Sequence, residues 1–279
     1  MKTVFKWLLW SLSALVVSIF LVLSVIHLAT TPSNDRDWSL DQAVLPYGEI
    51  SGDMVTIHNI RNFTYTSTKD YIPEYYDKTF DLSKIKNVYY IVEPFSGVPG
   101  SAHTFLSFEF EDEQFVAISV EIRKEKGESY HPLKGLFNQY EITYVIGDER
   151  DLIKLRTNYR KDLVYVYPAK TTKEKMQQLF VGMVRSATDL KDHPEFYNTL
   201  TNTCTTRIVH HVNTVTPDRV PFLNWRILLP EGSDRLAYDL GLIDTSLSFE
   251  ETRKRYFIND RAQKYALDED FSVKIREDE

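Results

Sequence analysis

Three residues have the types that cysteine acyl-transfer chemistry needs: Cys204, His103 and Glu121. Cys204 is the only cysteine of the chain, and an apolar run with helical spacing follows it. A thiol at a helix N-terminus loses its proton more readily, because the helix dipole and unpaired backbone N–H groups favour the thiolate. A histidine can accept that proton, and a carboxylate can orient the histidine. The sequence therefore predicts Cys204 as nucleophile, His103 as base and Glu121 as the orienting group.

The alternation of apolar and polar residues predicts two strands, at residues 102–110 and 114–122, joined by a loop at residues 111–113. With a three-residue loop, directly opposed residues bring His103 next to Glu121. A two-residue loop would shift the register by one residue and separate the pair. The contact between histidine and carboxylate therefore depends on the length of this turn.

Other segments must position this hairpin and the cysteine. Further strands are predicted at residues 87–95, 140–148 and 163–168 from their β-branched and aromatic residues. Residues 171–190 predict a helix, because Thr171 and Glu174 have the spacing of a capping box and an apolar stripe follows. These elements predict an α+β domain with a central antiparallel sheet and packed helices.

The remaining segments are less regular. Residues 38–91 read as loops with short strands. The last third predicts short helices and loops, with a second capping box at residues 248–251. The acidic end, residues 268–279, is expected to be a surface tail. Three arginines, at positions 123, 150 and 156, are expected to form surface ion pairs rather than to bind an anionic headgroup.

The N-terminus predicts a membrane anchor. Residues 7–29 carry no charge, and as a helix they would reach about 35 Å, enough to cross a hydrocarbon core of about 30 Å. A cleaved signal peptide fits less well, because its apolar run usually has about 7–15 residues. Lys2 and Lys6 precede the run, which predicts a cytoplasmic N-terminus. The expected division is a cytoplasmic stub and transmembrane anchor at residues 1–30 and a periplasmic domain at residues 31–279.

Bulk composition excludes several classes of function. The net charge of −7 makes nucleic acid a poor candidate as partner. A single cysteine in an exported domain rules out an internal disulfide, which leaves Cys204 as a free thiol. The sequence contains no phosphate loop, and its histidines lack the spacing of metal ligands. We therefore expect neither a cofactor nor a metal.

Five ordered segments resemble the Lnb N-terminal periplasmic domain family: SNDRDW, AHTFLSFEF, SVEIRKEKGE, GDERDLI and FYNTLTNTCTT. Cys204 and His103 match the nucleophile and base that the family is expected to use, and Glu121 falls in the SVE segment. The resemblance implies a fold similar to circularly permuted papain-like thiol enzymes. It also implies transfer of an acyl chain from a phospholipid to a lipoprotein through a thioester on the cysteine. The single predicted span provides no second membrane segment to hold that chain.

The predicted function is therefore a membrane-anchored periplasmic thiol acyl-transfer enzyme, similar to a lipoprotein N-acyltransferase. Its expected location is the bacterial inner membrane, with one span. Its expected partners are membrane phospholipid and either a lipoprotein or cell-wall peptide. Two alternatives stay open: a papain-like cell-wall peptidase or amidase with the same site, and a non-catalytic envelope binding module in which Cys204 is a small buried core residue.

Overall fold

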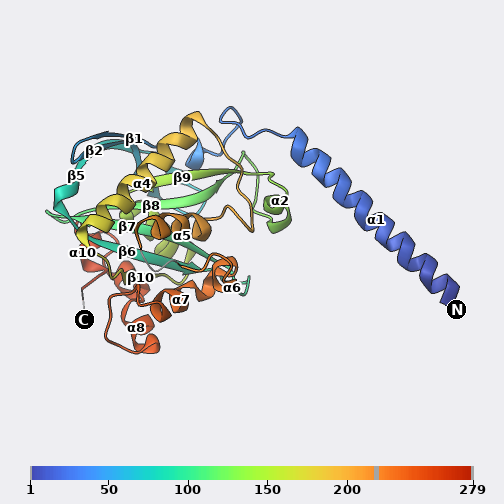
Figure 1. Cartoon of the computed structure of the whole chain (residues 1–279). Coiled ribbons are helices and arrows are strands. Elements are labelled where there is room, and N and C mark those ends of the chain that lie inside the picture. Colours follow the sequence, from blue (N-terminus) through green and yellow to red (C-terminus); the bar gives the residue numbers. More distant parts are fainter. Residues whose placement is uncertain (1, 217–219, 278–279) are drawn as a thin grey trace.

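An eight-stranded sheet forms the centre of the domain in the computed structural model, which describes residues 2–216 and 220–277 (Figure 1). Its strand order is β1-β2-β9-β8-β7-β6-β10, with β5 also paired to β2. Neighbouring strands are antiparallel apart from β2 and β9. The strands are β1 (Tyr47–Ser51), β2 (Met54–Arg61), β5 (Tyr75–Asp81), β6 (Ile85–Pro94), β7 (Ala102–Phe110), β8 (Gln114–Arg123), β9 (Glu141–Gly147) and β10 (Tyr165–Pro168), and a separate pair consists of β3 (Thr64–Tyr65) and β4 (Tyr71–Ile72).

The β7–β8 hairpin has the predicted register. Its turn consists of residues 111–113, and Phe105 lies opposite Ser119 as a three-residue loop requires. The predicted strands at 87–95, 140–148 and 163–168 are also confirmed, as β6, β9 and β10. The hairpin therefore sets His103 and Glu121 side by side at one end of the sheet.

Helices α4 (Lys173–Asp192) and α5 (Cys204–Val215) cover one face of the sheet (Figure 1). The apolar stripe of α4 is buried, as its periodicity predicts. The cap is one residue later than expected: the side chain of Thr172, not Thr171, accepts the N–H of Lys175. Helix α5 begins at Cys204 as predicted, because Thr203 and Thr206 form a reciprocal capping box there.

The opposite face of the sheet is covered by α3 (Glu149–Lys154), α9 (Asn259–Lys264), α10 (Phe271–Lys274) and η3, a π-helical turn at Leu155–Arg160. The expectation of a surface tail is wrong for residues 268–277, and residues 278 and 279 lie outside the described residues. Phe271 and Ile275 are fully buried in this layer. Apolar side chains at spacing i, i+4 share one face of a helical turn. Phe271 and Ile275 therefore pack together into the core on this face of the sheet.

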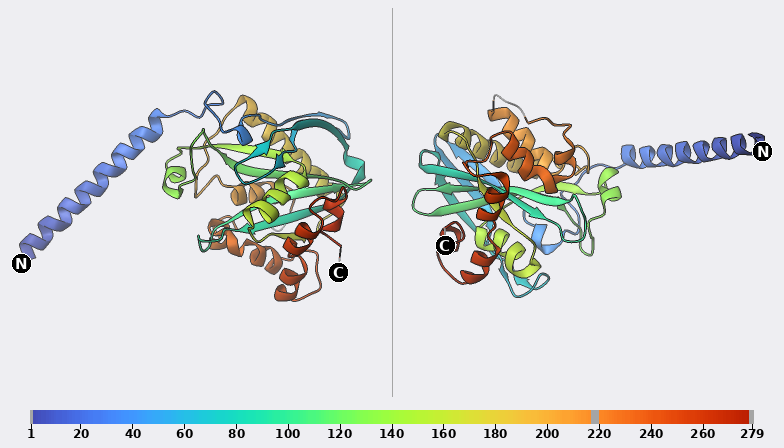
Figure 2. Two further views of the ribbon diagram at one scale, coloured as in Figure 1. Left: turned by 180° about the vertical axis from the view of Figure 1, so that it is seen from behind. Right: turned by 90° about the horizontal axis from the view of Figure 1, so that it is seen from below.

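The other short α-helices are α2 (Pro132–Leu136), α6 (Trp225–Leu228), α7 (Ser233–Asp239) and α8 (Phe249–Arg255), and the 3₁₀ turns are η1 (Leu40–Gln42), η2 (Leu82–Lys84) and η4 (Pro230–Gly232). The capping box at the start of α8 is confirmed, with Ser248 as the N-cap. The N-terminal helix α1 (Lys2–Ala29) extends away from the domain (Figures 1 and 2). Its stretch Phe5–Val22 is long and apolar enough to cross a membrane, and none of it is buried in the protein.

Candidate functional site

His103 and Glu121 are joined through a serine that the sequence analysis did not single out. The Nε2 atom of His103 lies 2.7 Å from the Ser119 hydroxyl, which donates to Glu121 Oε1 at 2.9 Å. Because the single hydroxyl proton goes to the carboxylate, Ser119 must accept the Nε2–H of the histidine. This arrangement fixes the imidazole tautomer and leaves Nδ1 with the free lone pair. The direct distance from His103 Nε2 to Glu121 Oε1 is 3.8 Å.

A buried arginine completes this network. Arg156, on η3, donates through Nη2 to Glu121 Oε1 at 2.9 Å and through Nε to Glu93 Oε2 at 2.6 Å. Its guanidinium also stacks over the ring of Phe105, on which His103 stacks in turn. The expectation that Arg156 forms a surface ion pair is therefore wrong, because its side chain is only 2% exposed. Paired charges in a dry environment hold one another in fixed positions.

Burial and charge together hold His103 neutral. Desolvation lowers the pKa of His103 to about 3, and the neighbouring Arg156 adds to this effect. Burial alone would raise the pKa of Glu121, but Arg156 holds it well below its usual range. For Glu93, burial outweighs the attraction of Arg156 and raises the pKa to about 7. At neutral pH the network therefore contains an uncharged imidazole beside an ionised Glu121.

The buried imidazole predicts a specific loss of stability in acid. In the unfolded chain His103 binds a proton as the pH falls below its ordinary pKa of 6.5. In the folded protein it stays neutral until the pH approaches its lowered pKa of about 3. The free energy of unfolding should lose up to about 1.4 kcal/mol per pH unit from this residue across that window. His103→Gln keeps a donor for Ser119 but removes the titration. Urea unfolding of the full chain in detergent between pH 4 and 7 should show a shallower dependence for His103→Gln than for the unchanged protein.

The control for this experiment is His193→Gln, because His193 is exposed. Its unfolding curves should follow those of the unchanged protein. Glu93 titrates in the same range, but it does so in all three proteins and cancels from the comparison. Parallel pH dependences for His103→Gln and the unchanged protein would contradict the buried neutral histidine.

Cys204 is partly buried at the first position of α5, a helix of 12 residues. Its Sγ lies 3.7 Å from the hydroxyl oxygen of Thr205. That hydroxyl in turn lies 3.0 Å from the hydroxyl of Thr104 on β7. The position of the thiol therefore depends on where α5 begins. The contact between Thr205 and Thr104 holds that end of α5 against β7.

His103 and Cys204 lie on opposite faces of β7. Neighbouring residues of a strand point to opposite sides, and Thr104 points to the α5 side, where it meets Thr205. His103 points to the other side, where it stacks on Phe105 against the layer of α3 and η3. The structure thus brings His103 and Glu121 together and leaves Cys204 apart from them. The catalytic roles of all three remain predictions.

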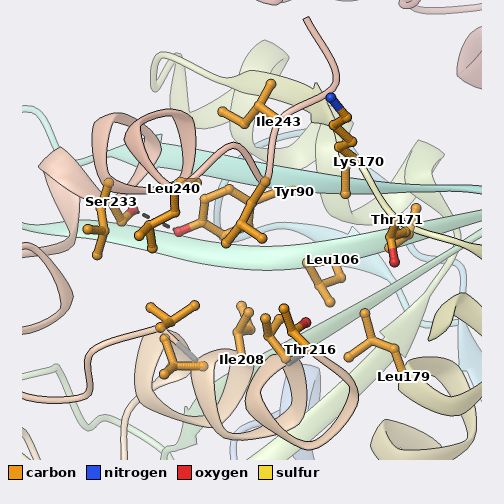
Figure 3. A pocket seen from close by; sticks show the side chains of 18 of the residues that line it. Tyr90, Leu106, Lys170, Thr171, Leu179, Ile208, Thr216, Ser233, Leu240 and Ile243 are labelled. Atoms are coloured by element: carbon orange, nitrogen blue, oxygen red, sulfur yellow. Dashed lines mark hydrogen bonds between the residues drawn. The ribbon is translucent and has the colours of Figure 1, made fainter. Parts of the chain in front are cut away.

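An aliphatic cavity of about 130 Å³ runs along the inner side of α5, between this helix, β6, β7 and α7 (Figure 3). Helix α5 lines it with residues at helical spacing: Thr205, Ile208, Val209, Val212 and Val215. The Tyr90 hydroxyl donates to Ser233 on its wall, which satisfies that polar group (Figure 3). Apolar cavities of about this size can stay dry and take up apolar ligands. Thr205, the residue after Cys204, lines the cavity, so one end of the cavity lies near the start of α5.

Sequence reasoning missed three members of the polar network: Ser119, Glu93 and Arg156. Two of them had a usable signal. Ser119 is two residues before Glu121 and therefore on the same strand face. Glu93 lies directly opposite His103 in the pairing of β6 with β7. Nothing in the local pattern identifies Arg156, because it reaches the site from a separate turn across the sheet face.

Together these features define a class: an α+β domain tethered to an apolar N-terminal helix, with a thiol at a helix start beside an aliphatic cavity. The family model described as the Lnb N-terminal periplasmic domain matches residues 71–231. The chain therefore belongs to the Lnb N-terminal periplasmic domain family, as the sequence motifs predicted. Comparisons with curated proteins and with solved structures found no match. The family and helix α1 identify an envelope-associated, single-pass membrane protein with a periplasmic domain.

Proposed function

We propose that this protein is a membrane-anchored periplasmic thiol acyl-transfer enzyme that forms a thioester on Cys204. The observation that carries the proposal is that Thr205, whose hydroxyl lies 3.7 Å from the Cys204 Sγ, lines an aliphatic cavity. An acyl chain whose carbonyl lies at Cys204 would extend along α5 past Ile208 and Val212. In this proposal the cavity, at about 130 Å³, would receive the first part of the acyl chain next to the carbonyl.

The reaction balances as two transfers. The Cys204 thiolate attacks the ester carbonyl of a phospholipid, the C–O bond breaks, and the lysophospholipid leaves as its alcohol with the proton that the thiol gave up. An amine, such as a lipoprotein N-terminus, then attacks the thioester carbonyl, and the C–S bond breaks to form an amide. The amine loses a proton and the thiolate is restored. Backbone N–H groups at the start of α5 would stabilise the oxyanion that forms on the attacked carbonyl.

The test is detection of the acyl-enzyme. The full chain is incubated with vesicles of phosphatidylethanolamine and phosphatidylglycerol, and its mass is measured before and after neutral hydroxylamine. We expect a hydroxylamine-sensitive acyl adduct that is absent from Cys204→Ala and retained in Thr201→Ala, an exposed position three residues earlier. An adduct that persists in Cys204→Ala, or no adduct with any acyl donor, would overturn the proposal.

The role of His103 as base needs a separate test, because β7 lies between its ring and the thiol. Direct proton transfer would require the start of β7 or of α5 to move. The rate at which iodoacetamide alkylates Cys204 is therefore measured against pH in the unchanged protein and in His103→Ala. A displaced profile in His103→Ala would support a direct role, and superimposable profiles would restrict His103 to a structural one.

The placement of His103 and Cys204 on opposite strand faces favours a second candidate, a non-catalytic envelope binding module. In that case the cavity would bind an acyl chain reversibly, without a thioester. Lipid that co-purifies with the protein and is released by organic solvent, with no change in protein mass, would identify this function. Release of soluble peptide from peptidoglycan would point instead to the cell-wall peptidase or amidase.

A further inference from the structure

A short tether holds the domain close to the end of helix α1. The helix ends at Ala29, and the backbone N–H of Ser33 already donates to the Glu141 side chain at 3.1 Å. Four residues span at most about 14 Å. The Asn34 side chain then donates to two carbonyl groups at the end of α4. The domain therefore cannot move far from the point where α1 leaves a membrane.

The tether joins one particular end of the domain, which we call the tether end. Glu141 begins β9, and at this same end β6 stops and β7 starts. Helix α2 lies here too, because Pro132 accepts a hydrogen bond from Thr199, in the segment that leads to α5. The start of α6 belongs to the same end in Figures 1 and 2, whereas α10 lies on the far side.

Large apolar side chains are exposed in the loops and short helices of the tether end. Leu229 lies against Gly100 in the turn from β6 to β7, and the adjoining backbone of Glu231 donates to Gly100 at 3.1 Å. Leu223 is 89% exposed. Leaving a leucine side chain in water is unfavourable by about 1.5–3 kcal/mol relative to burying it. The apolar members of this surface are Val98, Leu133, Leu200, Leu223, Trp225 and Leu229.

The chemistry of this surface fits the boundary of a lipid bilayer. Exposed apolar groups that gather in one region mark an interaction site, with either a protein or a membrane. Here the tether decides between them, because it holds the surface beside a membrane permanently. Trp225 is exposed next to aliphatic neighbours, and tryptophan is enriched at the level of lipid headgroups.

We propose that the tether end docks on the membrane surface, with the turn before α6, the turn at residues 198–201 and helix α2 inserted among the lipid headgroups. The segment 198–201 leads directly to Cys204, so docking would turn the start of α5 toward the lipid. This orientation does not depend on what the thiol does. A catalytic site and a reversible lipid-binding site would both open toward the bilayer.

Depth-sensitive labels in the full chain test this orientation. The background is Cys204→Ser, which removes the only native thiol. Leu223→Cys places an environment-sensitive fluorophore at the tether end. Leu267→Cys is the matched control, because Leu267 is 96% exposed and precedes α10 on the far side (Figure 1). Both labelled proteins are placed in nanodiscs of phosphatidylcholine and phosphatidylglycerol with or without doxyl-labelled lipid.

We expect doxyl lipid to quench the label at position 223 severalfold more than the label at position 267, with a blue-shifted emission only at 223. Equal and weak quenching at both positions would overturn the proposal. A second label at Leu200→Cys guards against a local effect of the first substitution. Its quenching should fall to the level of position 267 when Leu223→Glu and Trp225→Glu are added, and unchanged quenching in that variant would also count against docking.

Discussion

Replacing Arg156 by methionine is expected to lower the free energy of unfolding by about 3–5 kcal/mol. The guanidinium is the only described group that pairs with both Glu93 and Glu121, and all three side chains are largely or fully buried. Methionine keeps most of the volume of the side chain, but it leaves Glu121 without its arginine partner and Glu93 with only Arg160, at 3.7 Å. It also leaves the carbonyl of Leu152 without its side-chain donor. An uncompensated buried charge costs far more than the net value of the pair.

The midpoint of urea unfolding of the full chain in detergent measures this effect. Arg150→Met is the control, because Arg150 is 45% exposed and its pair with Asp148 should contribute less than about 1 kcal/mol. Adding Glu93→Gln and Glu121→Gln to Arg156→Met should restore part of the lost stability, since neutral side chains need no counter-charge. Equal midpoints for Arg156→Met and Arg150→Met would show that the network is not buried in solution.

The hairpin of β7 and β8 could be predicted because strand periodicity and turn length determine its register locally. A period of two assigns every side chain to a face, and a three-residue loop then fixes which residues are opposed. The proximity of His103 and Glu121 could therefore be predicted from the sequence alone. The connection through Ser119 could not be seen in the same way, because it depends on the rotamers of three side chains.

The separation of Cys204 from His103 is a different kind of outcome. Alternation along β7 places His103 and Thr104 on opposite faces, but no local pattern states which face α5 covers. That choice depends on packing between segments about 100 residues apart, in which Ile208 of α5 joins the core on the Thr104 side. The aliphatic cavity has the same origin, since its walls come from sheet, α5 and α7 together.

The buried position of Arg156 runs against its residue type. Arginine is mostly exposed in folded proteins, so a surface ion pair is the ordinary expectation. Burial here becomes tolerable because two acidic side chains and a backbone carbonyl accept its N–H groups. The sequence does not show these contacts, because they require Glu93 on β6 and Glu121 on β8 to lie on the face of the sheet that η3 covers.

Phe271→Ala is expected to cost about 3–5 kcal/mol of unfolding free energy, although Phe271 lies only eight residues before Glu279 in an acidic segment. The ring is fully buried in the core layer formed with Val164, Val166 and Ile258. Truncation to alanine removes most of the buried area and leaves a cavity that neighbouring rigid elements cannot fill. The same urea unfolding assay measures the loss.

Leu267→Ala provides the matched control four residues earlier. Leu267 is 96% exposed, so its truncation should change stability by no more than about 0.5 kcal/mol. Arg276, five residues after Phe271, binds the fully buried Glu149 and connects the same segment to the start of α3. If Phe271→Ala proved as stable as Leu267→Ala, α10 would not belong to the core, and the layer that holds Arg156 and His103 in place would have to close without it.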